Sequence, residues 1–294
     1  MNESRDIIVD FCVLPPLQET LEGFADPSGP FAKYSALYAR EASTVLIQEV
    51  TRNPVGFLLG LMDDAGVDIA VLTAEDTETT MGMKVPNEKV AALVRQCPER
   101  FMGMAAVDPH KGVRALRELE LAVKDLGMKC VCLEPWLHKI HSNDKLYYPI
   151  YAKCVELDVP VWIHTAVNFV PKLPIDFGRP IYLDEVAGHF PELRIVAGHG
   201  GWPWVNELMA ILWRHDNVFA DIGAIRPRYI GAPGTGWETL LRYGDAILQD
   251  KIVFATAWPA QDFKRSITEI RALPIKDEVK RKWLGGNARK ILKL

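Results

Sequence analysis

The segments VPVWIHTAV (residues 159–167), IYLDEVAGHF (181–190) and LRIVAGHGG (193–201) define one unit of a repeating pattern. The first and third are short apolar runs typical of buried strands, and the second is amphipathic, as expected for a helix. Near-continuous apolar strands separated by helices predict a parallel sheet covered by helices on its outer side. A histidine stands near the end of each predicted strand, His164 in the first and His199 in the second.

The same alternation extends in both directions along the chain. Eight strands are predicted, each followed by a helix, over residues 7–14, 68–75, 101–109, 129–136, 159–167, 193–201, 217–225 and 251–258. Eight such units favour closure into a (β/α)8 TIM barrel, with residues 1–294 as a single domain. No GxGxxG motif follows the first strand, so a dinucleotide-binding fold has no support.

Composition excludes several classes of function. The formal net charge is -4, and Lys and Arg form no stripe suited to a nucleic acid backbone. No apolar run approaches the roughly 18 residues of a membrane span, and the first residues lack a signal peptide pattern. Five cysteines without CxxC spacing fit reduced thiols. These features predict a cytoplasmic protein whose partner is a small molecule, with no nucleic acid and no membrane.

Polar residues near the carboxyl ends of the predicted strands are the candidates for chemistry, because TIM-barrel active sites lie at that end. They are Asp10, Cys12, Glu75, Asp76, Asp108, His110, Glu134, Trp136, His164, His199, Asp221 and Trp258. In the first strand, IIVDFCVLPP (7–16), Asp10 and Cys12 are two positions apart. Alternate residues of a strand share one face, so both side chains are expected to point into the barrel.

Several of these motifs resemble the amidohydrolase superfamily. They are VWIHT on the fifth strand, IVAGHGG after HFPELR on the sixth, WP at the end of the eighth, and GMKCVCLEPW with YYPIYAKCVELDVPV around the fourth. The similarity covers nearly the whole chain. It is to the amidohydrolase-related branch, which includes lactonases, other hydrolases and metal-dependent decarboxylases similar to aminocarboxymuconate semialdehyde decarboxylase and γ-resorcylate decarboxylase.

The resemblance implies roles for some residues and departs from the family at others. The family usually places His-x-His or Glu-x-His on strand one, a His on strands five and six, and an Asp on strand eight. This implies His164 as a metal ligand and His199 as a second ligand or acid/base. Ala257 stands where the strand-eight Asp is expected. On strand one the two family ligands are replaced either by Cys12 and Leu14 or by Asp10 and Cys12, depending on the register.

Two kinds of site remain open. Asp10, Cys12 and His164 could hold a single divalent metal such as Zn, with water as the fourth ligand. Without a cofactor, Cys12 could form a thiolate/imidazole pair with one of the histidines, and Glu134 or Asp10 could act as a general base for water. The structural alternatives are that Cys12 is a small buried apolar residue and that Glu134 is an ion-pair partner.

The substrate side is less specific. Trp136 and Trp258 predict an aromatic-lined mouth, and Arg226 could bind a carboxylate. We therefore expect hydrolysis of an ester, lactone or amide of a small aromatic or carboxylated molecule. In that reaction His164 would activate water and His199 would transfer protons. The alternatives are decarboxylation or another carbon–carbon lyase reaction in the same pocket, and a non-catalytic barrel with a lost metal site. The resemblance also implies a homodimer.

Overall fold

A computed structural model describes residues 6–26, 33 and 44–294. Its central sheet contains eight strands, which are β1 (Val9–Val13), β2 (Ile69–Thr73), β5 (Phe101–Ala106), β6 (Cys130–Leu133), β7 (Val161–His164), β8 (Ile195–Gly198), β9 (Val218–Asp221) and β10 (Ile252–Val253). They are neighbours in that order, and every adjacent pair in the sheet is parallel. Each of the eight predicted strands is therefore present.

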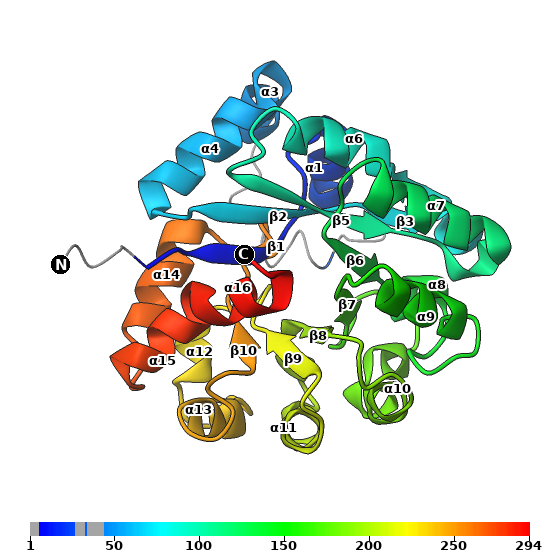
Figure 1. The fold of residues 1–294 in the computed structure, drawn as a ribbon. Coiled ribbons are helices and arrows are strands. Elements are labelled where there is room, and N and C mark those ends of the chain that lie inside the picture. The colour runs from blue at the N-terminus through cyan, green and yellow to red at the C-terminus, as the bar shows by residue number, and fades with distance from the viewer. Residues whose placement is uncertain (1–5, 27–32, 34–43) are drawn as a thin grey trace.

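The two ends of the sheet meet, so the sheet closes into a barrel (Figure 1). The Phe11 N–H donates to the Phe254 carbonyl at 3.0 Å, and the Ala257 N–H donates to the Cys12 carbonyl at 2.8 Å. A further bridge joins Val13 to Trp258. These contacts connect β1 to the segment that follows β10, and they confirm the predicted (β/α)8 TIM barrel.

Helices surround the barrel (Figure 1). The longer ones are α1 (Gln18–Ala25), α3 (Thr44–Arg52), α4 (Pro54–Ala65), α6 (Asn87–Val94), α7 (Val113–Lys124), α9 (Tyr148–Glu156), α10 (Leu183–His189), α11 (Val205–Arg214), α13 (Glu238–Gly244), α14 (Phe263–Arg271), α15 (Asp277–Arg281) and α16 (Asn287–Leu292). Short helical turns are α5 (Glu78–Met81), α8 (Pro135–His138), α12 (Pro227–Ile230), η1 (Pro109–Lys111), η2 (Ile175–Gly178), η3 (Pro180–Tyr182), η4 (His199–Gly201) and η5 (Lys282–Gly286). Within the described ranges, no helix has the length and apolarity to cross a membrane.

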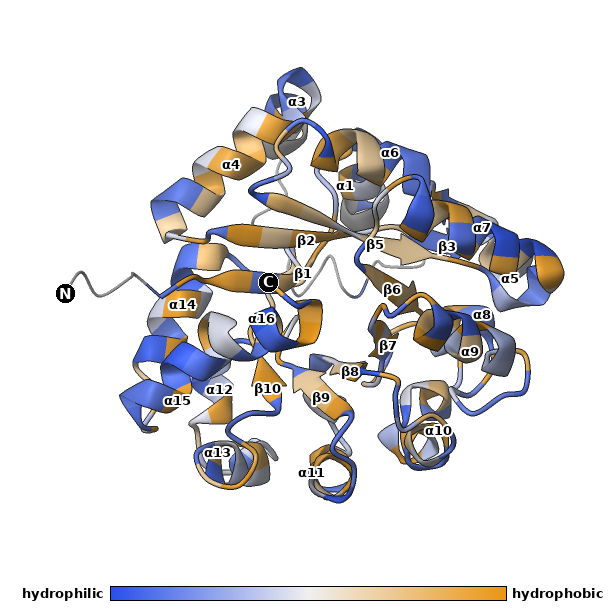
Figure 2. Cartoon of the chain, in the orientation of Figure 1, coloured by the Kyte–Doolittle hydropathy of each residue, from blue (hydrophilic) through white to orange (hydrophobic). Residues whose placement is uncertain are grey.

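Side chains of the strands alternate between two apolar layers. On β6, Cys130 and Cys132 point into the barrel interior together with Trp162, whereas Val131 packs in the outer layer against the helices. Apolar residues on the surrounding helices face the strands (Figure 2). Gly198 has a specific role, because a Cβ there would lie 2.3 Å from the Trp162 ring. Its missing side chain makes room for the Trp162 ring inside the barrel.

The last helix covers one end of the barrel. In Figure 1, α16 lies across the middle of the barrel, near the C-terminus. Its residues Ile291 and Leu292 belong to the same interior cluster as Val9, the first residue of β1. The amino-terminal end of the barrel is therefore covered, and the carboxyl-terminal end is left for a site.

The structure differs from the expected pattern in two places. A hairpin of β3 (Glu75–Thr77) and β4 (Met83–Val85) follows β2 and pairs antiparallel, outside the barrel sheet. The predicted last strand, 251–258, has regular pairing only over Ile252–Val253. The carboxyl group of Asp10 explains this shortening, because it accepts hydrogen bonds from Thr256 N at 3.1 Å and Thr256 Oγ1 at 2.6 Å.

Candidate active site

A cavity of about 370 Å³ lies at the carboxyl ends of the barrel strands. Its wall includes six of the candidate residues, which are Cys12, Glu75, Glu134, Trp136, His164 and His199. Ala257, which the resemblance aligns with the strand-eight Asp of the family, also lines it. The volume is within the range that binds single small molecules.

The cavity wall contains backbone in an unusual conformation. His199, Ala224 and Ala257 all line the cavity and have φ angles of 66°, 58° and 51°. Positive φ is unfavourable for residues with a side chain, and such strain concentrates at ligand-binding and catalytic sites. The local backbone therefore supports a functional role for this end of the barrel.

The two histidines predicted from neighbouring strands lie together. The rings of His164 and His199 are 4.9 Å apart between centroids and inclined at 76°. Trp136 lies 5.5 Å from His164, and Trp162 lies 5.2 Å from His199. Burial lowers the pKa of His164 well below its usual value, and the neighbouring His199 lowers it further. Both rings are therefore neutral at physiological pH, and a neutral imidazole has one donor and one acceptor nitrogen.

Asp221 orients His199. Asp221 Oδ1 accepts hydrogen bonds from the backbone N–H of His199 at 2.9 Å and of Gly223 at 2.7 Å. Trp162 Nε1 donates to Asp221 Oδ2. The Nδ1 atom of His199 lies 3.8 Å from Asp221 Oδ1, so a proton on Nδ1 is electrostatically favoured. Burial lowers the pKa of His199, and Asp221 partly opposes this effect. The Nε2 atom is then the acceptor of the ring.

Glu134 is an acid in an apolar part of the cavity. Burial raises its pKa to about 8, and the negative charge of Glu75 adds to the effect. Glu134 Oε2 accepts a hydrogen bond from Trp136 Nε1 at 2.6 Å, and Oε1 has only a long contact with Cys132 Sγ at 3.9 Å, so Oε1 is the oxygen that can carry the proton. Glu134 is therefore protonated at neutral pH. Such a group can donate a proton, whereas the sequence suggested a general base at this position.

Cys12 and Asp10 are both in the barrel interior, but only one reaches the cavity. Burial raises the pKa of the Cys12 thiol well above its usual value, with Asp221 and Asp10 as further causes. A neutral thiol is a weak nucleophile and metal ligand. Asp10 is fully buried and accepts hydrogen bonds from the backbone N–H of Cys12 at 3.2 Å and from Thr256. Asp10 thus joins β1 to the segment after β10 and is not part of the cavity wall.

Asp10 makes the stability of the protein depend on pH. Burial raises its pKa from 3.8 to about 7, so its favourable contribution is complete below about pH 4 and is lost as pH rises through 7. We expect the free energy of unfolding of wild type to fall over this range by on the order of 4 kcal/mol relative to Asp10→Asn. Urea unfolding at several pH values measures the difference. Parallel curves for the two proteins would contradict it, and the exposed Asp277→Asn is the control.

Two residues predicted to bind substrate lie outside the cavity wall. The Trp258 ring stacks on Phe263, with centroids 6.4 Å apart and planes inclined at 5°. Arg226 forms an ion pair with Glu269 of α14. Trp258 therefore packs against the outer helices, and the charge of Arg226 is already paired.

Glu75, which lines the cavity, and Asp221, which is buried against His199, were candidates at strand ends but were given no role from the sequence. Each is an acidic residue at the end of an apolar strand, which is the signal that identifies them. Their roles could not be inferred without the hairpin that turns Glu75 inward and the turn that brings His199 over Asp221.

The barrel and the histidine pair at its carboxyl end define the class of protein. The chain belongs to the amidohydrolase family, whose model matches residues 45–294, and thus to a superfamily of enzymes. Among curated relatives, it is 26% identical over 292 residues to γ-resorcylate decarboxylase of Polaromonas sp. (strain JS666), covering 80% of this chain and 86% of that protein.

Solved structures agree with the fold. An uncharacterised TIM-barrel protein from Bordetella bronchiseptica has a TM-score of 0.76 and 27% identity, with 97% of this chain and 98% of that chain covered. 5-Carboxyvanillate decarboxylase from Novosphingobium aromaticivorans DSM 12444, complexed with manganese and 4-hydroxy-3-methoxy-5-nitrobenzoic acid, has a TM-score of 0.72 and 18% identity, with 100% and 98% covered. At that identity the second likeness is evidence for the fold alone.

The manganese in that structure raises the question of whether this chain can hold a divalent metal. The Nδ1 atom of His164 is buried without a hydrogen-bond partner among the described residues, and Nε2 is the acceptor nitrogen of His199, so two imidazoles are available. Further ligands are not available from Asp10 and Asp221, because each carboxylate already accepts three hydrogen bonds. Ala257 has no side-chain atom that could bind a metal. Over the described residues, no group of three His, Cys, Asp or Glu is arranged to hold a metal. The donor set does not fit the three-ligand centres of zinc enzymes.

This misfit predicts weak metal binding. We expect no stoichiometric Mn²⁺ complex of wild type at micromolar Mn²⁺ by isothermal titration calorimetry and electron paramagnetic resonance. Ala257→Asp should bind Mn²⁺ more tightly, because it adds a carboxylate beside the cavity and Asp tolerates the left-handed backbone found there. One tightly held Mn²⁺ per wild-type chain would contradict the prediction.

Proposed function

We propose that this protein decarboxylates a small hydroxylated aromatic acid. The observation that carries the proposal is the protonated Glu134 in the same apolar cavity as the neutral imidazoles of His164 and His199. Hydrolysis was the leading expectation from sequence, with decarboxylation as its alternative. The γ-resorcylate decarboxylases, which match over 80% of the chain, favour the alternative.

The reaction requires a proton at the ring carbon that bears the carboxylate. Glu134 supplies it in this proposal, since its carboxyl group is protonated below about pH 8 and faces a cavity with apolar walls. Protonation of the carbon is followed by cleavage of the carbon–carbon bond, and the bonding electrons restore the aromatic ring. The products are carbon dioxide and the ring with hydrogen in place of the carboxylate, and Glu134 is left ionised.

His199 assists from the hydroxyl side of the substrate. With the proton on Nδ1 beside Asp221, the Nε2 atom can accept a hydrogen bond or a proton from a phenolic hydroxyl. Removing that proton increases the electron density of the ring and favours its protonation by Glu134, and His199 returns the proton to the oxygen when loss of carbon dioxide restores the aromatic ring. His164, 4.9 Å from His199 between ring centroids, is placed to hydrogen bond a second polar group of the same ligand.

The cavity walls suit a flat aromatic ring, and they solvate the carboxylate of such a substrate poorly. Trp136 and Trp162 flank the two imidazoles, as aromatic surfaces for a planar ligand. Lys84 lies on the cavity wall, but its ammonium is 3.1 Å from Asp76 and is therefore paired. Loss of carbon dioxide disperses the charge of the carboxylate, so an environment that solvates this charge poorly favours the reaction.

A substrate panel tests the proposal. It contains 2,6-dihydroxybenzoate and 5-carboxyvanillate, which occur in the names of similar solved structures, together with other hydroxybenzoic acids and a set of esters, lactones and amides. Product analysis by chromatography should show decarboxylation of at least one acid. Hydrolysis without any decarboxylation would instead support the sequence expectation. If no compound of the panel is turned over or bound, the result would support a non-catalytic barrel.

A further inference from the structure

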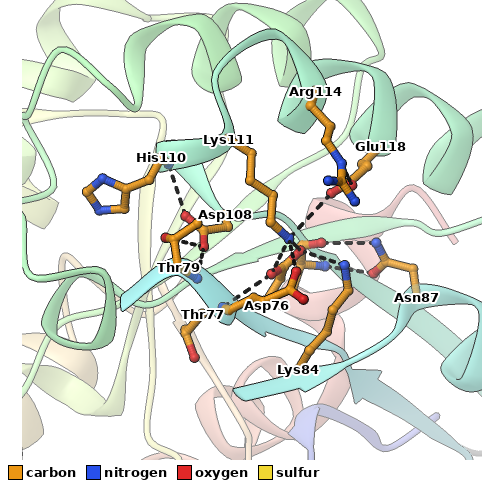
Figure 3. A network of polar contacts seen from close by, with 12 residues as sticks. Asp76, Thr77, Thr79, Lys84, Asn87, Asp108, His110, Lys111, Arg114 and Glu118 are labelled. Atoms are coloured by element: carbon orange, nitrogen blue, oxygen red, sulfur yellow. Dashed lines mark hydrogen bonds and ion pairs between the residues drawn. The ribbon is translucent and has the colours of Figure 1, made fainter. Parts of the chain in front are cut away.

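Glu75 is an acidic residue of the cavity that the proposed chemistry leaves without a role. It is the first residue of β3, and the hairpin register places it opposite Val85, whereas Asp76 is opposite Lys84. Glu75 and Val85 both line the cavity. Asp76 and Lys84 meet each other within a separate polar network (Figure 3). The alternation of the hairpin thus directs two consecutive carboxyl groups to opposite sides.

The two carboxyl groups have different surroundings. Asp76 is held by two lysines, with Lys111 Nζ at 2.7 Å from each carboxylate oxygen and Lys84 Nζ at 3.1 Å (Figure 3). Glu75 forms no ion pair with any residue in the described part of the chain, and it accepts a hydrogen bond from Thr77 Oγ1 at 3.3 Å. Glu75 is half-buried, and an acid that is partly shielded from water and has no counter-ion favours its protonated form.

Glu75 and Glu134 line the same cavity. Burial raises the pKa of Glu75, and the charge of Glu75 is the second cause of the raised pKa of Glu134. Burial disfavours the charged forms of Cys12, Cys132, Tyr147, His164 and His199, which stay neutral near pH 7. The charged groups of the cavity wall, Lys84 and Glu19, form ion pairs with Asp76 and Lys89. Two carboxyl groups in one apolar cavity do not ionise independently, so they behave as a coupled pair.

We propose that Glu75 is a second proton carrier of this site, which returns a proton to Glu134 after each turnover. This inference rests on the decarboxylation proposed above. Once Glu134 has given its proton to the ring carbon, Glu75 takes a proton from solvent at the mouth of the cavity and passes it to the Glu134 carboxylate. One solvent proton enters for each carbon dioxide released, which balances the reaction.

The first test compares Glu75→Gln with wild type, using the exposed Glu88→Gln as the matched control. We expect kcat of Glu75→Gln to fall at least tenfold near neutral pH and KM to fall in proportion, so that kcat/KM changes little, since the residue acts after the irreversible chemical step. The decline of kcat at alkaline pH should occur at lower pH in Glu75→Gln than in wild type, because Glu134 loses a negative neighbour. Small carboxylic acids added to the buffer should restore part of kcat. A kcat and pH profile equal to those of wild type would overturn the proposal.

A second measurement does not depend on turnover. Infrared difference spectra of the substrate-free enzyme follow the protonated carboxyl groups during a pH titration, and Glu134→Gln identifies the band of Glu134. We expect this band to disappear at lower pH in Glu75→Gln than in wild type. If the Glu134 band shifts in this way but wild type decarboxylates no acid of the panel, the result would support the coupled pair and overturn the proposed function. An unchanged titration would overturn the coupling.

Discussion

Glu134→Gln is expected to lower kcat for decarboxylation by about 10²–10⁴-fold, the usual contribution of a positioned general acid. Glutamine preserves the size of the side chain and can accept the hydrogen bond from Trp136 Nε1, but it has no acidic proton. KM should change little, because the lost interaction is made in the transition state. Rates measured at saturating substrate, with the exposed Glu88→Gln as control, give the comparison.

The pH dependence of wild type provides a separate check on the same residue. The acid form of Glu134 exists below its pKa of about 8, so kcat is expected to decline as pH rises through that value. In Glu134→Gln, kcat should be low at every pH and should not decline as pH rises through 8. A wild-type rate that increases steadily above pH 8, or a Glu134→Gln variant as active as wild type, would show that Glu134 is not the proton donor.

His199→Asn is expected to have the second large effect, again a loss of about 10²–10⁴-fold in kcat. Asparagine tolerates the positive φ of 66° at this position better than alanine, so the backbone turn over Asp221 should be retained. The variant removes the Nε2 acceptor that takes the hydroxyl proton of the substrate. Kinetics should be measured together with circular dichroism and thermal unfolding.

The control for this substitution is His189→Asn, at an exposed histidine on α10 that hydrogen bonds Tyr148. It should keep wild-type kinetics. Substrates without a hydroxyl group should be poor substrates of wild type and should respond less to His199→Asn. Equal losses in the two histidine variants, or an active His199→Asn, would contradict the role of His199.

The barrel was predictable because its signal is repeated. Each strand is a short apolar run, and the side chains of Cys130, Val131 and Cys132 alternate as a two-residue period requires. The hairpin after β2 was not predictable, since EDT and MKV have no apolar pattern and pair with each other away from the barrel sheet. The last strand was predicted too long, because the hydrogen bonds of Asp10 to Thr256 depend on residues far apart in the chain.

The site was predictable in part. His164 and His199 end adjacent parallel strands, so their proximity follows from the fold. Position on a strand could not show that the carboxyl group of Asp10 is engaged in hydrogen bonds with Thr256. It also could not show that Trp258 packs outward on Phe263. The protonation of Glu134 depends on its distance from water and from Glu75, which three-dimensional structure alone defines. A single domain, a homodimer and a cytoplasmic location stay predictions.

Release of ¹³CO2 from carboxyl-labelled 2,6-dihydroxybenzoate, or from the best acid of the panel, tests the central claim most directly. Wild type should be measured after removal of metals with a chelator, and again with added Mn²⁺. The donor set of the cavity predicts equal rates in the two conditions, both reduced by about 10²–10⁴-fold in Glu134→Gln. Release that requires Mn²⁺ and persists in Glu134→Gln would contradict decarboxylation by the residues of this cavity.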